Sequence, residues 1–125
     1  MKGVPSLPAA FRQFVRLFNA GQYWESHEVL EEPWRRNHSR FYQGLIILAS
    51  AYVHRKHGKA LSYERQLHKA RPYLEPYRPY YLGLDIAEVV EMIDVGLASG
   101  TASDQTPHLL LRRECVQGDE LELSD

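Results

Sequence analysis

The chain has 125 residues, which is enough for one domain with a single hydrophobic core. Hydrophobic residues make up 44% and charged residues 25%, values that are ordinary for a globular protein and that argue against disorder along the whole chain. Lys and Arg total 15 against 16 Asp and Glu, so the net charge of -1 provides no bulk attraction to nucleic acid or to an acidic membrane.

Two helices are expected in the first third of the chain. Apolar residues recur at helical spacing over residues 11–18, and this first helix is expected to stop at residues 19–21, where Gly21 can adopt the left-handed conformation. A second helix is expected from about Gln22 to about Asn37. Pro33 lies inside that pattern and removes a backbone donor, so a kink or an early end near Glu32 is expected.

The third predicted helix, residues 40–57, is apolar on most sides and should be the buried central helix. Its exceptions are Gln43, Ser50 and His54, which fall on one polar stripe at about 100° per residue. A polar stripe on a buried helix requires hydrogen-bonding partners. We therefore expect this stripe to face polar groups of a neighbouring helix.

The remaining chain contains two further helices and a tail. A fourth helix is expected to end near residue 75, and a proline- and tyrosine-rich connection leads to a fifth helix that Asp85 caps. We predict an all-α domain, residues 1–100, formed by about five helices in one bundle or orthogonal array. Residues 101–125 are predicted to be an extended, partly mobile C-terminal tail that lies along the bundle or pairs with another chain, so a homo-oligomer stays open.

The location of the protein is expected to be cytoplasmic, with no membrane association. The longest apolar stretch, residues 44–53, is far shorter than the roughly 20 residues that a spanning helix requires. The N-terminal sequence MKGVPSLPAAF lacks the apolar run of a signal peptide.

The stretch GQYWESHEVLEEPW, residues 21–34, holds the one constellation that could carry chemistry. His27 and Glu31 are one turn apart, so an imidazole and a carboxylate could bind one divalent metal ion, Zn, Fe or Mn. His54 from the polar stripe would be the third ligand and would leave open positions for water, as in a hydrolytic site. In that arrangement Glu28 would be the general base, and Gln43 would orient a ligand or the substrate.

The same residues also have a structural interpretation. A histidine that is hydrogen-bonded to a glutamate across two helices, with Gln43 completing the network, would fix helix pairing without catalysis. H-E-x-x-E is weak evidence for a metal, because it lacks the second histidine of the H-E-x-x-H zinc motif. Glu25 points to nearly the opposite side of the helix and fits a role at the helix dipole.

Three strings, FNAGQYWESHEVLEEPW, FYQGLIILASAYVHRKHG and GLDIAEVVEMI, resemble the helical family called domain of unknown function 309. The resemblance covers about residues 11–97 and implies a small all-helical protein; some members are labelled predicted metal-dependent hydrolases. The resemblance also implies that Glu25 belongs with the polar cluster, against the helical wheel. The family positions fall on Gly21, Glu25, His27, Glu28, Glu31, Trp34, Gln43, Gly44, His54, Gly83 and Asp85.

Three functions therefore stay open. The first is a metal-dependent hydrolase acting on an unknown small molecule. The second is a non-catalytic helical binding or scaffold module with a small-molecule or protein partner, in which the polar cluster is a structural hydrogen-bond network. The third is a nucleic-acid accessory protein, which the charge balance disfavours, since basic clusters such as residues 35–40 and 55–59 are more often solvated faces.

Overall fold

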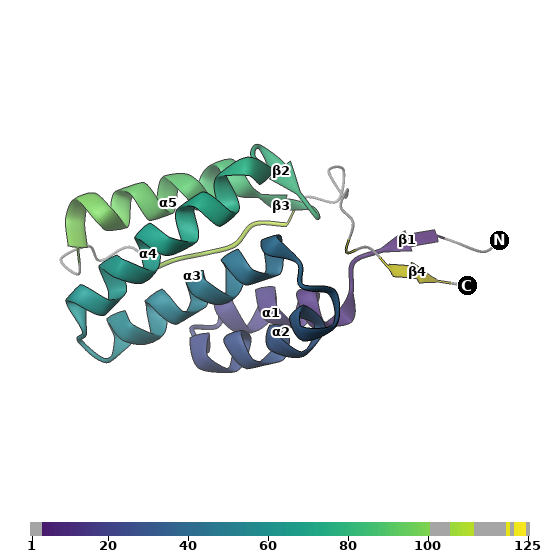
Figure 1. Cartoon of the computed structure of the whole chain (residues 1–125), viewed down its shortest axis with the longest axis horizontal. Coiled ribbons are helices and arrows are strands. Elements are labelled where there is room, and N and C mark those ends of the chain that lie inside the picture. Colours follow the sequence, from purple (N-terminus) through teal and green to yellow (C-terminus); the bar gives the residue numbers. More distant parts are fainter. Residues whose placement is uncertain (1–3, 101–105, 112–119, 121, 125) are drawn as a thin grey trace.

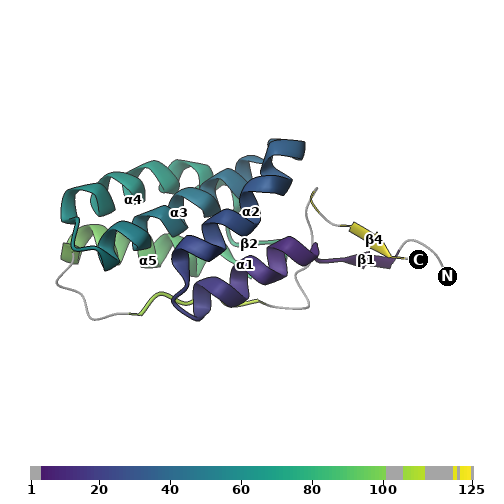
Figure 2. The ribbon, with the colours of Figure 1, turned by 90° about the horizontal axis from the view of Figure 1, so that it is seen from below.

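Helix α3 lies at the centre of the fold in this computed structural model, which describes residues 4–100, 106–111, 120 and 122–124. Helices α1 and α2 lie on one side of it, and α4 and α5 lie on the other (Figures 1 and 2). The predicted all-α fold of about five helices with an extended C-terminal segment is confirmed. The helices of the described residues are α1 (Ala9–Asn19), α2 (Tyr23–Asn37), α3 (Arg40–Lys56), α4 (Ala60–Leu74) and α5 (Ile86–Ser99), with a short 3₁₀ turn η1 (Glu75–Tyr77).

The core is rich in aromatic side chains where α1 and α3 meet. Phe14 and Phe18 of α1 are fully buried, and the ring of Phe18 meets Tyr52 of α3 edge-on, with centroids 5.6 Å apart. On its opposite side α3 approaches α4 closely at Gly44, which is buried. The prediction of a buried central helix is therefore confirmed, because residues on most sides of α3 are inside the core. Among the described residues, no helix has the length and apolar character to cross a membrane.

Local signals in the sequence define most helix ends. Gly21 adopts a φ of 80° between α1 and α2, as expected for the residue that closes a helix. The side chain of Asp85 accepts a hydrogen bond from the Glu88 amide at 3.0 Å, which confirms it as the N-cap of α5. Ser39 accepts from the Tyr42 amide at 3.1 Å and caps α3 in the same way.

Of the two effects expected from Pro33, a kink or an early end, the early end near Glu32 does not occur, and the expected end of α2 near Asn37 is confirmed. The helix continues through Pro33 to Asn37 and closes with His38 in the left-handed conformation, where the His38 amide donates to Trp34 at 2.7 Å. A proline inside a helix costs roughly 3 kcal/mol. Packing on both sides of the proline outweighs that cost, since Leu30 is fully buried and Trp34 packs against the core.

Two short antiparallel ribbons complete the described structure. Strands β2 (Tyr80–Tyr81) and β3 (Leu84–Asp85) are joined by Leu82 and Gly83, both with positive φ, as a two-residue hairpin turn of type I′ requires. Strand β1 (Val4–Ser6) pairs with β4 (Glu122–Ser124), and this ribbon projects away from the helices (Figure 1). Strands thus form a minor part of the described residues, in agreement with the predicted all-α fold.

An extended segment, residues 106–111, runs along the helices toward β3 (Figure 1). The side chain of Asn19 anchors it, because its amide nitrogen donates to the Leu109 carbonyl at 2.9 Å and its oxygen accepts from the Leu109 amide at 2.7 Å. Leu109 is 1% exposed, and the Asp85 amide donates to the Leu110 carbonyl at 3.1 Å. This part of the predicted tail is thus attached to the helical domain; residues 112–119 of the tail lie outside the described residues.

Candidate functional site

The H-E-x-x-E motif forms a ladder of contacts along α2. Glu31 Oε1 lies 2.8 Å from His27 Nδ1, and Glu31 Oε2 accepts from Arg35 at 2.9 Å. The His27 ring stacks on Trp24, with centroids 5.4 Å apart and an angle of 12° between the planes. The side chains of His27 and Glu31 are 20% and 29% exposed, so the predicted pairing of imidazole and carboxylate occurs at the edge of the core.

The contact between His27 and Glu31 is close but poorly aligned. Nδ1 of His27 is buried and makes no well-directed hydrogen bond within the described part of the chain, although the carboxylate oxygen is within reach. A separation of 2.8 Å without alignment does not make a directed hydrogen bond. Nδ1 of His27 is therefore available for a hydrogen bond or for a metal ion.

The predicted third ligand does not join this pair. The described residues contain no group of three or more His, Cys, Asp or Glu side chains that could hold a metal ion. No hydrogen bond or ion pair in the described structure joins His54 or Gln43 to the α2 pair. Both side chains are half-buried on α3, whereas Glu28 and Glu25 are exposed on α2. The three-ligand centre is thus not assembled here, and the catalytic roles of Glu28 and Gln43 stay predictions.

The reason for this difference is the axial position of the two helices. The rings of Tyr23 and Tyr52 lie 5.5 Å apart, and the start of α2 meets the end of α3. In such an antiparallel pair, His27 is level with about residue 48 of α3. His54 is about six residues away, or about 9 Å along the axis at 1.5 Å per residue. A helical wheel gives the direction of a side chain but not this axial position.

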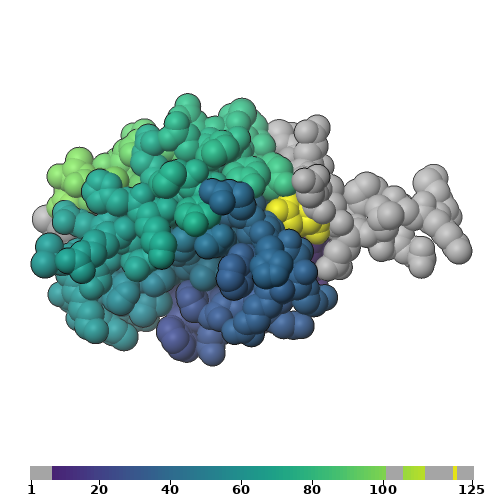
Figure 3. All heavy atoms as spheres, in the orientation of Figure 1, coloured from purple at the N-terminus to yellow at the C-terminus, as the bar shows by residue number. Residues whose placement is uncertain are grey.

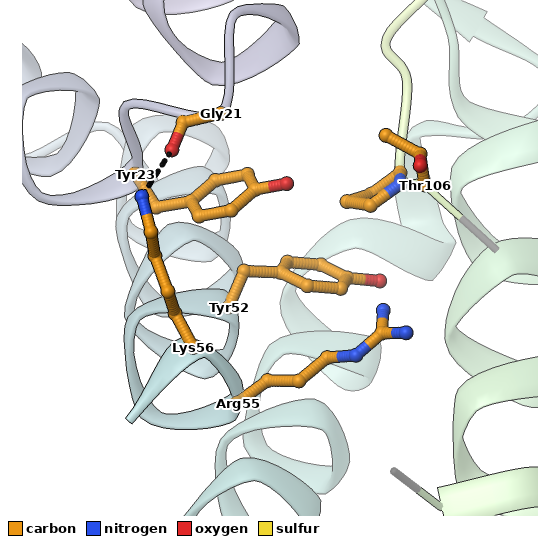
Figure 4. Close-up of a pocket in the computed structure, with 7 residues that line it drawn as sticks. Gly21, Tyr23, Tyr52, Arg55, Lys56 and Thr106 are labelled. Atoms are coloured by element: carbon orange, nitrogen blue, oxygen red, sulfur yellow. Dashed lines mark hydrogen bonds between the residues drawn. The ribbon is translucent and has the colours of Figure 1, made fainter. Parts of the chain in front are cut away.

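A separate site, with hydroxyl and basic groups on its walls, lies where α2 begins and α3 ends. It is a cavity of about 360 Å³, which we call the tyrosine–arginine cavity. Figure 4 shows the hydroxyl groups of Tyr23 and Tyr52 and the guanidinium of Arg55 pointing to the same side, toward the segment that carries Thr106. The cavity is lined by Gly21, Tyr23, Tyr52, Arg55, Lys56, Thr106 and Pro107.

Helix contacts hold these side chains in place. Arg55 lies 5.9 Å from the ring centre of Tyr52 and 5.8 Å from that of Tyr63 on α4, within the range of a cation–π interaction. The ammonium of Lys56 donates to the Gly21 carbonyl at 3.3 Å and so ties the end of α3 to the turn before α2 (Figure 4). Four structural elements therefore determine the geometry of the cavity: α2, α3, α4 and the segment 106–111.

The tyrosine hydroxyls are protonated at neutral pH. Burial raises the pKa of Tyr23, and the positive charge of Arg55 offsets part of that rise. The pKa of Tyr52 is raised well above its usual range, first by burial and then by the neighbouring Tyr63 hydroxyl, to which it is hydrogen-bonded. A protonated hydroxyl can donate to an anionic oxygen, so Tyr23 adds a neutral donor to the fixed cation of Arg55.

A second cavity of about 240 Å³ adjoins the first and shares Tyr23 and Lys56 with it. We call it the tryptophan cavity, because the exposed ring of Trp24 forms one of its walls. Its remaining lining residues are Glu25, Val53 and His57. The two cavities place aromatic rings and basic side chains around the junction of α2 and α3.

Sequence reasoning missed the tyrosine–arginine cavity. The sequence pattern indicates a solvated basic face for residues 55–59 and predicts no functional role for Tyr23. The sequence does hold a signal, because Tyr52 and Arg55 are three residues apart and share one side of a helix. The sequence does not predict that Tyr23 and Thr106 line the same cavity.

Comparison with known proteins identifies one family. None of the curated proteins matches this chain. The family model for the domain of unknown function DUF309 matches residues 11–65. This match spans the motif of α2, the whole of α3 and every helical residue of the tyrosine–arginine cavity. The comparison therefore assigns a DUF309 domain to residues 11–65 of the chain.

Proposed function

We propose that this protein is a helical binding module that holds a small anionic ligand in the tyrosine–arginine cavity. The observation that carries the proposal is the convergence of the Arg55 guanidinium with the hydroxyls of Tyr23 and Tyr52 on one cavity (Figure 4). A guanidinium presents several donors in a planar fork, which suits a phosphate or a carboxylate. The volume of about 360 Å³ is within the range of small-molecule sites.

The helix termini around the cavity support an anionic ligand. Gln22, the N-cap of α2, makes no side-chain hydrogen bond to the first turn, so the leading amides of α2 keep donor capacity beside the cavity. The positive end of the α2 dipole lies there as well. Arg55 and Lys56 also lie in the last turn of α3 and oppose the negative end of its dipole, so part of their charge serves the helix itself.

A metal-dependent hydrolase is less well supported by the described donor set. Catalytic zinc sites usually employ three protein ligands, whereas His27 and Glu31 supply two that are in contact. The described residues therefore do not fit a three-ligand centre. The binding-module hypothesis requires no third metal-binding side chain.

Binding of ribose 5-phosphate, measured by isothermal titration calorimetry, tests the proposal. Loss of one charge-assisted hydrogen bond costs about 1.5–3 kcal/mol, so Arg55→Gln should weaken binding about tenfold to a hundredfold. Tyr52→Phe should weaken it by a smaller factor. Arg65→Gln is the matched control, since Arg65 is exposed on α4 and is not among the residues that line the cavity.

Two results would contradict the proposal. One is the absence of binding to the wild-type protein at millimolar ligand. The other is equal affinity in the Arg55→Gln and Arg65→Gln variants. Thermal unfolding of each variant, followed by circular dichroism, checks that the loss of the contacts of Arg55 with Tyr52 and Tyr63 has not unfolded the domain.

A further inference from the structure

The H-E-x-x-E ladder of α2 ends at a tryptophan that is largely exposed. Trp24 has 56% of its surface accessible, which is unusual for so large an aromatic side chain. Its ring stacks on His27, and His27 in turn contacts Glu31 at 2.8 Å. Arg35 holds the other oxygen of that carboxylate at 2.9 Å. Successive contacts at spacings of three and four residues thus connect one stripe of α2 and restrain the indole ring.

The restrained indole borders the tryptophan cavity rather than open solvent alone. This cavity shares Tyr23 and Lys56 with the tyrosine–arginine cavity, so the two cavities are neighbours, and a ligand that bridged them would pass along these two residues. Glu25 also lines the tryptophan cavity and offers an acceptor there. An aromatic face, an acceptor and a nearby cationic pocket are the features that bind a heteroaromatic ring with an amino group and an attached anion.

We propose that Trp24 is the stacking platform for the ring of a nucleoside monophosphate-like ligand and that His27 is a positioning residue that orients the indole through Glu31. The inference rests on the proposed function, because the phosphate of this ligand occupies the tyrosine–arginine cavity. It gives the H-E-x-x-E motif a role that requires no metal. Arg35 fixes the Glu31 carboxylate, this carboxylate contacts the imidazole of His27, and the imidazole stacks on the indole of Trp24.

The experiment compares adenosine 5′-monophosphate with ribose 5-phosphate, which has the same anion and no ring. The chain contains two tryptophans, so a Trp34→Phe background leaves Trp24 as the only one. In that background, adenosine 5′-monophosphate should quench the Trp24 fluorescence and bind about tenfold or more tightly than ribose 5-phosphate, as expected for a stacked base. In the wild-type protein, Trp24→Ala should lower the affinity for the nucleotide to that for ribose 5-phosphate and leave the latter unchanged.

The role of His27 has its own readout. In the Trp34→Phe background, His27→Gln should lower the fluorescence anisotropy of Trp24. It should also weaken nucleotide binding several-fold and leave the affinity for ribose 5-phosphate unchanged. His68→Gln, at an exposed position of α4, is the matched control and should change neither quantity. Unchanged anisotropy and unchanged nucleotide affinity in His27→Gln would overturn the positioning role.

The outcomes separate this inference from the proposed function. Equal affinity for both probes, or nucleotide binding that survives Trp24→Ala, would overturn the stacking platform while the anion site stands. Failure of both probes to bind would overturn the anion site and the platform with it. A nucleotide preference that is lost in Trp24→Ala, together with ribose 5-phosphate binding that is lost in Arg55→Gln, would support both.

Discussion

Replacement of Gly44 by alanine tests how closely α3 and α4 pack. A Cβ atom at this position would lie 2.7 Å from Leu74 Cδ2 and 2.9 Å from Tyr73 Cβ. Leu74 is fully buried, and Tyr73 Cβ is fixed to the backbone, so neither can move away freely. The two helices must therefore separate slightly to accept the added methyl group.

The expected size of the effect follows from two opposing terms. Overpacking of a core contact costs about 1–3 kcal/mol, whereas alanine is more favourable than glycine inside a helix by about 0.5–1 kcal/mol. The net loss of unfolding free energy should lie between about 0 and 2.5 kcal/mol, with a central value near 1 kcal/mol. For a chain of this size, a loss of about 1 kcal/mol lowers the melting temperature by about 3–6 °C.

Thermal unfolding followed by circular dichroism measures this loss, and a second background identifies its cause. Leu74→Ala removes the two side-chain atoms nearest to the new methyl group, so Gly44→Ala should cost clearly less in that background. A higher melting temperature for Gly44→Ala alone would show that helix propensity dominates and would refute the close helix contact. An equal cost in both backgrounds would refute the role of Leu74.

Three further predictions concern metal binding, the extended segment and pH. Zinc affinity, measured by titration calorimetry on protein without a histidine tag, should be weak and unaffected by His54→Ala; stoichiometric binding that is lost in both His27→Ala and His54→Ala would restore the three-ligand site. Asn19→Ala removes two hydrogen bonds to Leu109 and should cost about 1–3 kcal/mol while increasing amide exchange at residues 106–111; unchanged exchange there would contradict the anchoring role. Arg71 is hydrogen-bonded to Asp94 at 2.8 Å and holds the pKa of that carboxyl below its usual value of 3.8. The stabilisation of the fold by this pair is therefore present above about pH 3.8, and it disappears as the pH falls through the lower pKa of the folded state. Asp94→Asn should therefore lower the melting temperature at neutral pH and converge with the wild type in strong acid; a constant difference at every pH would contradict this linkage.

Local sequence signals determined the helices and most of their ends. Helical spacing of apolar residues, the glycine at position 21 and the N-cap at Asp85 each act within a few residues of chain, so they can be interpreted without a structure. The exception is Pro33, where a local penalty was overcome by the burial of Leu30 and the packing of Trp34 in the tertiary fold. The pairing of His27 with Glu31 is likewise local, because a helix places residues four apart on one side.

Tertiary structure alone decided which side chains meet across elements. The antiparallel packing of α2 on α3 brings Tyr23 to Tyr52 and leaves His54 away from His27, and no helical wheel contains that axial position. Thr106 reaches the same cavity from far along the chain, through a segment that Asn19 anchors. Periodicity fixes only the direction of each side chain around its own helix axis. The relative translation of two helices, and the path of an extended segment over them, depend on how buried side chains fit together along the whole contact.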